Sequence, residues 1–354
     1  MSQLYTVILL EENEVRFIDV EKNDGGGIEN LDGDTFWDPS TTIKEDSPEE
    51  LFDNLAIRLK SHRENGKRAA SWGKSGQSFD VIISLPGTLE NETSIRSSSR
   101  LKIRFGFDVQ QFMKKHELAV RLVHDVEAIA WGVFLHLEPV LNLGIETSTL
   151  ALILIDEGVG AKFIINGSTF TGAGMAGTIS RLVVQPEGAF FTKLRSRGNL
   201  EVFASRPWIS RSIIENHISM LTKTPQGNCE SQELREFANK LKSLAADEGS
   251  WELLTFDDIA KGITIEHRGC RKAVDAAAKH IGHTVHKIMT ILNPHAIVLT
   301  GDAIEKLPGF YNTINEVAMD AAWPNCWTSC KMIEGDNARS SQATGAVFLG
   351  AKYE

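Results

Sequence analysis

Short apolar runs alternate with helical patterns along the chain. Runs rich in β-forming residues predict strands at residues 5–10, 15–20, 81–85, 119–123, 149–155, 161–165 and 296–300. Apolar residues at three- and four-residue spacing predict helices at 210–221, 231–245 and 271–292. Residues 24–35 are rich in Gly, Asn and Asp and are expected to form a loop or a wide turn. The recurring order of strand, polar segment and helix indicates an α/β fold.

The pattern occurs twice. Strands 149–155 and 161–165 correspond to 5–10 and 15–20, and the strand near 297–299 corresponds to 81–85. We therefore expect two α/β domains with a cleft between them. The N-terminal domain spans 1–130 and is joined by a C-terminal helix at about 340–354. The C-terminal domain spans 131–339 and carries a helical insertion at about 206–292.

The most informative stretch is Ser148 to Gly177, where glycine-rich turns connect predicted strands. A Gly-x-Gly turn such as Gly158-Val159-Gly160 can direct backbone N–H groups toward an anion, and it can equally be a tight turn without a ligand. Both interpretations of this loop remain open.

Composition limits the classes of partner. The formal net charge is −10, so a nucleic acid is not expected as the main partner. Because few residues precede Val7, we do not expect a helix-turn-helix of a DNA-binding repressor, and we expect the short N-terminal apolar run not to cross a membrane. No Cys-x-x-Cys pair occurs, so we expect reduced thiols in a cytoplasmic protein; the cysteines are Cys229, Cys270, Cys326 and Cys330.

Several linked segments resemble the ROK family, a bacterial group of sugar kinases and repressors within the actin-like ATPase superfamily. The segments that carry the resemblance are Pro86-Gly87, His124-Asp125-Val126-Glu127-Ala128, Gly158-Val159-Gly160-Ala161, Asn166-Gly167, Gly172 to Gly177, Leu200 to Ser205, Leu292-Asn293-Pro294 and Leu299-Thr300-Gly301. The resemblance implies two ribonuclease-H-like domains, a sugar ligand, a nucleotide and a homodimer.

The sequence departs from the family pattern at functional positions. The first phosphate loop of the family is Asp-x-Gly-Gly-Thr, whereas here Glu11 and Glu12 replace its glycines and should repel a triphosphate. Thr178 and Arg181 replace a sugar-binding Glu and His. The resemblance places the family's structural zinc at Arg181, Thr192, Leu194 and Asn199, which are not a zinc ligand set, so no zinc is expected and packing should stabilise this loop.

The resemblance also supplies the candidate site residues. It implies Asp125 as the catalytic base, and the alternative role for Asp125 is an N-cap of the following helix. The candidate substrate-binding residues are His124, Asp125, Glu127, Glu201 and Gly174, and the candidate nucleotide-binding residues are Gly158, Gly160 and Gly301. Glu201 can equally be a favourable acid in the first turn of a helix.

Three histidines at three-residue spacing, His280, His283 and His286, suggest a metal site, but no carboxylate or cysteine completes the pattern. We take them as packing or surface residues and expect no metal.

The sequence thus predicts a protein of the sugar-kinase type that binds a small polar ligand, plausibly a sugar, with weakened or lost ATP phosphotransfer. The alternatives are an active hexose or aminohexose kinase that uses Mg-ATP and Asp125, and a non-catalytic regulatory or assembly protein.

Overall fold

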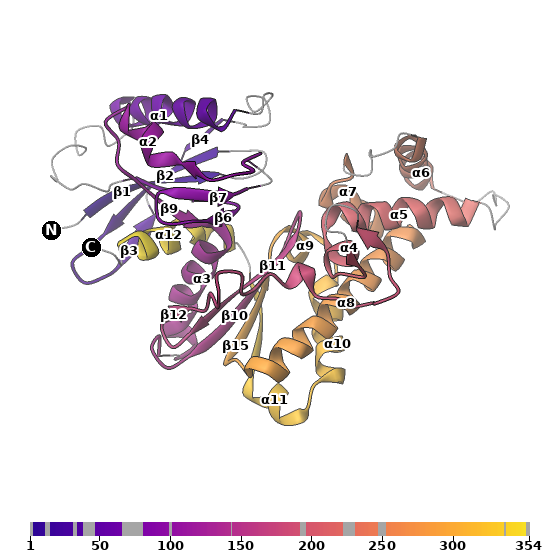
Figure 1. Ribbon diagram of the computed structural model, residues 1–354. Coiled ribbons are helices and arrows are strands. Elements are labelled where there is room, and N and C mark those ends of the chain that lie inside the picture. Colours follow the sequence, from indigo (N-terminus) through magenta and orange to yellow (C-terminus); the bar gives the residue numbers. More distant parts are fainter. Residues whose placement is uncertain are drawn as a thin grey trace. The chain divides into compact units, whose positions relative to one another are not determined.

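A computed structural model describes residues 3–10, 15–30, 34–37, 47–65, 81–98, 101–142, 144–191, 196–221, 231–246, 253–335 and 338–351 (Figure 1). Glu11 and Glu12, where the sequence departs from the family's first phosphate loop, lie outside these residues. The chain divides into two compact units: unit 1 comprises residues 1–143 and 338–354, and unit 2 comprises residues 144–337. In the described part of the chain, no helix has the length and apolar character that a membrane span requires.

Unit 1 is a mixed sheet with helices on both faces. Its elements are β1 (Gln3–Leu10), β2 (Val15–Lys22), β3 (Ile28–Asn30), β4 (Asp34–Trp37), α1 (Pro48–Asn65), β5 (Val81–Leu85), β6 (Thr88–Leu89), β7 (Ser94–Ser97), β8 (Phe107–Asp108), α2 (Val109–Lys114), β9 (Val120–His124), α3 (Asp125–Leu141) and α12 (Gln342–Gly350). The strand order is β3-β2-β1-β5-β9, with β4 also paired to β2. Strands β1 and β2 are antiparallel, whereas β1, β5 and β9 are parallel.

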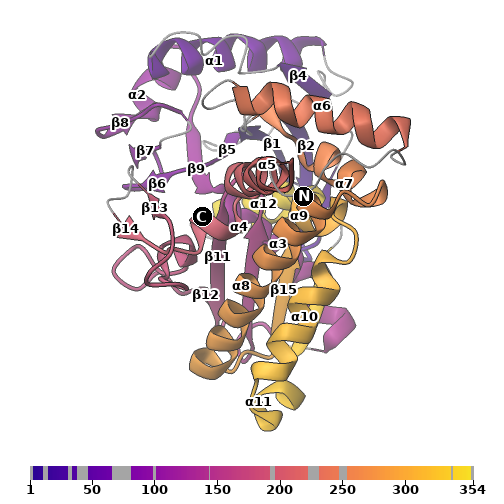
Figure 2. The same ribbon diagram turned by 90° about the vertical axis from the view of Figure 1, so that its right-hand side faces the viewer.

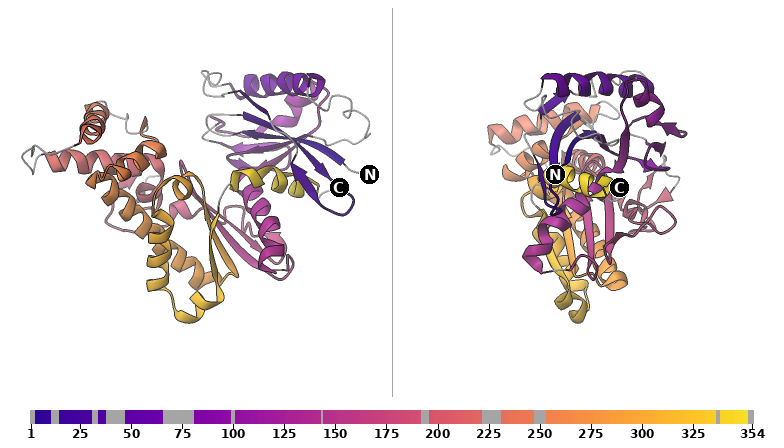
Figure 3. Two further views of the ribbon diagram at one scale, coloured as in Figure 1. Left: turned by 180° about the vertical axis from the view of Figure 1, so that it is seen from behind. Right: turned by 90° about the vertical axis from the view of Figure 1, so that its left-hand side faces the viewer.

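The two faces of this sheet bury different cores. Ile8 and Phe17 pack with α1 and α2 on one face, while Val7 and Leu9 pack with α3 and α12 on the other. Figure 3 shows α3 and α12 next to each other on that second face. Alternate residues of β1 therefore serve the two cores, which explains why its apolar run is unbroken.

Unit 2 repeats the arrangement. Its elements are β10 (Thr149–Ile155), β11 (Val159–Ile165), β12 (Ser168–Thr169), β13 (Phe190–Phe191), β14 (Ser196–Arg197), α4 (Glu201–Ala204), α5 (Arg206–Leu221), α6 (Gln232–Ala246), α7 (Phe256–Thr264), α8 (Arg268–Leu292), β15 (Ala296–Thr300), α9 (Asp302–Lys306), α10 (Phe310–Ala321), α11 (Pro324–Ser329) and β16 (Lys331–Gly335), together with a 3₁₀ turn at Ile179–Arg181. The sheet order is β12-β11-β10-β15-β16, antiparallel up to β10 and parallel from β10 to β16. The expected correspondence between the two halves is therefore present in the strand pairing.

The helices of unit 2 form a large core against one face of this sheet. Helices α8 and α10 pack along each other, as Figure 2 shows, and their apolar residues join those of α5 and α7. Gly282 of α8 makes this packing close, because a Cβ there would lie 2.7 Å from the Cβ of Val317. Asn293 ends α8 in the left-handed conformation, directly before Pro294.

The expectation of a loop at residues 24–35 was wrong in part. β3 pairs with β2 from Val20↔Asn30 to Lys22↔Ile28, and β4 pairs with β2 as well. A short strand at a sheet edge is held by backbone hydrogen bonds and does not need an apolar run, so composition alone concealed it.

Two glycines allow α3 and α12 to touch. A Cβ at Gly345 would overlap the carbonyl oxygen of Ala128, and a Cβ at Gly132 would overlap the carbonyl oxygen of Ser341. The contact fixes α3, whose first residue is Asp125, against the sheet.

We expect Gly345→Ala to destabilise unit 1 by several kcal/mol, since the added methyl group must push the two helices apart. Chemical denaturation would measure the loss. Gly106→Ala is the matched control, because its Cβ would make an ordinary 3.5 Å contact with Glu90. Equal stability of the two variants would show that the helices have room to separate.

A pair of buried histidines joins α5 to the start of α8. His217 and His267 are each 5% exposed, and their ring nitrogens Nδ1 and Nε2 lie 3.1 Å apart. His267 Nδ1 accepts the Cys270 N–H and caps α8. Burial, followed by the proximity of His217, lowers the pKa of His267 to about 4. The folded state therefore favours neutral His267.

Because the unfolded chain binds the proton near pH 6.5, this contribution to stability is present above that pH and is lost as the pH falls toward 4. We expect His267 to account for a loss of about 2 kcal/mol between pH 7 and pH 5. In His267→Asn, which keeps a capping side chain, the loss should be smaller by that amount. Denaturation at both pH values tests this, and parallel losses in the two proteins would contradict it.

Candidate functional site

The candidate residues of unit 1 lie where β9 meets α3. The register pairs Leu85 of β5 with His124 of β9, so the carboxyl ends of these parallel strands share one edge of the sheet. His124 is the N-cap of α3, and its Nδ1 accepts the Val126 N–H at 3.2 Å. The N-cap is therefore His124 and not Asp125, which is the first residue of α3.

His124 and Asp125 are in direct contact. Nδ1 of His124 lies 3.0 Å from Oδ1 of Asp125, and the same oxygen accepts the Val126 N–H at 2.7 Å. The positive end of the α3 dipole stabilises negative charge here. A carboxylate in this position can accept a proton from a hydroxyl group. Glu127 is half-buried in the same helical turn, and its carboxylate makes no ion pair with any described residue.

The neighbouring strand end is fixed by buried polar contacts. Gln342 of α12 donates to Ser84 Oγ at 2.9 Å, and Ser98 Oγ donates to the Pro86 carbonyl at 2.6 Å. Gly87 has a φ of +140°, and a Cβ there would lie 2.7 Å from the Ser97 carbonyl oxygen. The Pro86-Gly87 turn therefore requires glycine for both its conformation and its space.

In unit 2, four predicted residues lie at or next to the turn between β10 and β11: Gly158, Gly160, Glu201 and Gly301. Gly301 has a φ of +105°, and a Cβ on it would lie 2.5 Å from the carbonyl oxygen of Ile155. A Cβ on Gly158 would lie 3.5 Å from Oε1 of Glu201, the first residue of α4. Gly160 pairs with Leu154 inside the hairpin and has open space around it.

This turn carries acidic residues. Asp156 is 8% exposed, and its N–H donates to the Gly158 carbonyl at 2.8 Å. Glu157 forms a two-point ion pair with Arg206: Nε contacts Oε1, and Nη2 contacts Oε2 at 2.7 Å. Arg206 Nη1 also donates to the Leu254 carbonyl at 2.7 Å. The turn thus carries Asp156 and Glu157, with Glu201 beside Gly158, and Arg206 pairs with Glu157.

Gly174 lies in an exposed turn after β12. It has a φ of +102°, and its N–H already donates to the Thr171 carbonyl at 2.8 Å. The next glycine with a tight environment is Gly177, where a Cβ would overlap the Ala161 carbonyl oxygen. This segment is therefore held closely against β11 at Gly177, while Gly174 is at its outer end.

The positions that the resemblance assigns to zinc do not fit a metal. Asn199 is 3% exposed, donates through Nδ2 to the Arg181 carbonyl at 2.9 Å, and accepts from Ser196 Oγ at 2.6 Å. Thr192 and Leu194 lie outside the described residues. Across the ranges that the structure describes, no group of three or more His, Cys, Asp or Glu side chains is placed to hold a metal ion. At Asn199 and Arg181, a hydrogen-bonded amide joins the two segments.

The histidines of α8 have separate environments. His280 stacks on Phe203 of α4 with ring centroids 4.3 Å apart, and its pKa is lowered by burial, then by His283 and Lys287. His283 is exposed and His286 is half-buried. His280 thus packs against the residue two positions after Glu201.

Comparison with known proteins identifies the family. The sequence model described as "ROK family" matches residues 70–352. The chain belongs to the ROK family.

Among characterised ROK relatives, a glucokinase from Halalkalibacterium halodurans is 29% identical over 153 residues, covering 43% of this chain and 41% of that protein. The DNA-binding transcriptional dual regulator NagC of Escherichia coli is 22% identical over 249 residues, covering 68% of this chain and 53% of NagC. The chain thus spans about half the length of the curated relatives it matches.

The fold is shared by ROK regulators and ROK sugar kinases. A ROK family transcriptional regulator, a homolog of the E. coli MLC protein, matches with a TM-score of 0.72 and 18% identity, covering 99% of this chain and 78% of that chain. The structure of a ROK glucokinase from Streptomyces griseus in complex with glucose and AMPPNP matches with a TM-score of 0.68 and 14% identity, covering 98% of this chain and 99% of that chain. The α/β fold of two ribonuclease-H-like, actin-like ATPase domains is therefore confirmed.

Sequence reasoning missed the acidic turn. Only the glycines of this turn were considered from the sequence, but Asp156 and Glu157 also lie in it, beside Glu201. A signal was present in the Asp-Glu dipeptide directly before Gly158. The Arg206 partner had no such signal, because it lies 49 residues farther along the chain.

We expect Asn199→Ala to lower the stability of unit 2 by about 1 kcal/mol, because the part-buried hydrogen bond from Asn199 Nδ2 to the Arg181 carbonyl is lost. Thermal unfolding with and without EDTA measures this. The control Asn216→Ala removes only a 3.4 Å side-chain contact and should cost less. A lower unfolding temperature of the unaltered protein in EDTA would contradict the absence of a structural metal.

Proposed function

We propose that this chain is a sugar-kinase-like protein that binds a sugar or sugar derivative and has weakened or lost ATP phosphotransfer. The carrying observation is the acidic β10–β11 turn, which occupies the position that the family resemblance assigns to phosphate. Asp156 and Glu157 lie in this turn, Glu201 lies beside it, and Arg206 pairs with Glu157. A triphosphate at this position would meet like charges, a cost of about 1 kcal/mol per pair at 4 Å in water and more near a protein surface.

The backbone of the turn supports the same conclusion. The Asp156 N–H is directed to the Gly158 carbonyl, and the Asp156 carbonyl accepts the Arg206 N–H at 3.2 Å. The turn is therefore closed by its own hydrogen bonds and by α5. A phosphate-binding loop needs N–H groups directed outward toward the anion, and the Asp156 N–H is already bonded within the turn.

The sugar assignment rests on carboxylates that can accept hydrogen bonds from hydroxyl groups. Asp125 is held at the start of α3, and Glu201 at the start of α4, where Ser205 Oγ donates to the Glu201 carbonyl at 2.9 Å. We assign Asp125, His124, Glu127 and Glu201 to ligand binding. Gly174 receives a weaker role, because its N–H is already bonded.

An active hexose or aminohexose kinase is the rival function, and the contact between His124 and Asp125 favours it. With Nδ1 protonated, His124 would donate to Asp125 Oδ1 and orient the carboxylate that removes a proton from a sugar hydroxyl, and the Val126 N–H would then bond to Asp125 alone. In this alternative Mg-ATP is the cofactor, with Gly158, Gly160 and Gly301 near the nucleotide. The acidic turn argues against it.

A non-catalytic regulator is the third candidate, supported by the match to NagC. The net charge of −10 favours a small ligand or a protein partner over nucleic acid. By family resemblance we also propose a cytoplasmic homodimer. Size-exclusion chromatography with light scattering distinguishes a dimer from a monomer.

Isothermal titration tests the main proposal. We expect glucose or N-acetylglucosamine to bind without nucleotide, and Glu201→Gln to weaken binding about tenfold, because hydrogen bonds to a charged acceptor become neutral ones. Glu187→Gln removes an exposed carboxylate of the same unit and is the matched control. Mg-ATP should give no micromolar binding.

The rival functions predict different results. Micromolar Mg-ATP binding together with sugar-dependent ADP release that Asp125→Asn abolishes would establish the kinase. Absence of binding by every sugar and nucleotide tested would favour the regulatory or assembly role, and would contradict the sugar assignment.

A further inference from the structure

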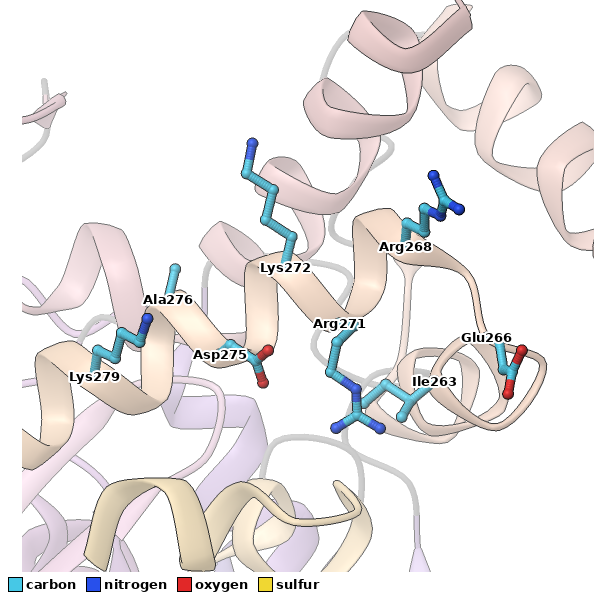
Figure 4. Close-up of a pocket in the computed structure, with 8 residues that line it drawn as sticks. All are labelled: Ile263, Glu266, Arg268, Arg271, Lys272, Asp275, Ala276 and Lys279. Atoms are coloured by element: carbon cyan, nitrogen blue, oxygen red, sulfur yellow. The ribbon is translucent and has the colours of Figure 1, made fainter. Parts of the chain in front are cut away.

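A basic cavity lies along the outer face of α8, in unit 2. Its volume is about 810 Å³, and it is lined by Ile263, Glu266, Arg268, Arg271, Lys272, Asp275, Ala276 and Lys279 (Figure 4). Four cationic side chains therefore meet two acidic ones in a chain whose net charge is −10. The cavity therefore has a positive net charge, whereas the protein as a whole has a negative one.

The fold does not use these charges. Arg268, Lys272 and Lys279 make no hydrogen bond or ion pair with any residue that the structure describes. Arg271 donates to the Pro308 carbonyl at 3.3 Å and forms no ion pair within 4.0 Å with a described residue. Arg268 and Lys272 are four residues apart on one helix face, and like charges at that spacing destabilise a helix. Binding of an anionic ligand would explain why these cationic side chains lie close together.

The arrangement suits one kind of ligand. Arg and Lys donors bind phosphate oxygens, and the planar Arg group can contact two oxygens at once. Figure 4 shows Arg268 and Lys272 extending to one side of α8, and Arg271 extending toward Ile263. Ile263 and Ala276 supply apolar surface, while the carboxylates of Glu266 and Asp275 can accept hydrogen bonds from hydroxyl groups. The volume falls in the range of small-molecule sites.

We propose that this cavity binds a small, hydroxylated organic phosphate through Arg268, Arg271, Lys272 and Lys279. Arg268 and Lys272, one helical turn apart and extending to the same side of α8, contact the phosphate, and Arg271 and Lys279 add positive charge along the cavity. The carboxylates of Glu266 and Asp275 contact hydroxyl groups of the organic part. The site is formed within unit 2 by α8 and the end of α7, and it includes neither the β10–β11 turn nor Glu201. It is thus a second ligand site, independent of the proposed sugar binding.

Titration calorimetry at about 0.15 M salt, where weak surface attraction is largely screened, tests the site. Glucose 6-phosphate and AMP represent a sugar and a nucleoside source of the phosphate, and pyrophosphate is the probe without hydroxylated carbon. We expect one of the two organic phosphates to bind more tightly than pyrophosphate. Arg268→Gln combined with Lys272→Gln should weaken that binding about 100-fold, roughly tenfold for each lost charged donor.

The control combines Lys242→Gln with Lys287→Gln. It removes the same charge from exposed positions of α6 and α8 outside the cavity, and binding should stay within about threefold of the unaltered protein. Matching melting temperatures would show that both variants fold. The proposal is overturned if neither organic phosphate binds, if the two double variants weaken binding equally, or if pyrophosphate binds as tightly as the organic phosphates.

Discussion

Parallel pairing of strands is the constraint on which the arrangement of both units depends. Parallel neighbours end at the same edge of the sheet, so the residues that follow them are brought together whatever their distance along the chain. In unit 1 this places Leu85 beside His124, and in unit 2 it places Thr300 beside Leu154. Helix starts, turns and polar side chains lie at these edges because each of them directly follows the carboxyl end of a strand.

The same edge has different chemistry in the two units. Unit 1 presents a carboxylate and an imidazole at the start of a long helix, an arrangement that remains compatible with proton transfer. Unit 2 presents a turn closed by an arginine and by its own hydrogen bonds. A fold shared with kinases therefore does not determine whether the chemistry is retained, because fold and site are specified by different residues.

Much of the fold could be predicted from the sequence, because unbroken apolar runs mark strands that are buried on both faces. The positions of Gly158 and Gly301 followed from the order of the motifs. The edge strand β3 could not be predicted, since backbone pairing leaves little trace in side-chain pattern. Nor could the Arg206 and Asn199 contacts, which depend on the folded path of segments between them. The sequence shows that the β10–β11 turn is acidic, but it does not show the hydrogen bonds and the ion pair that hold the turn.

The packing of α12 on α3 also bears on how the protein is made. Helix α12 completes the second core of unit 1, yet its residues are translated after all of unit 2. During synthesis, nearly two hundred residues are translated between α3 and α12. Until α12 is made, its apolar partners in unit 1, among them Val7 and Leu9, remain uncovered by it. Unit 2 is contiguous and can fold on its own schedule. The apolar surface left on nascent unit 1 is therefore a natural point of contact for chaperones, and of error when translation stalls.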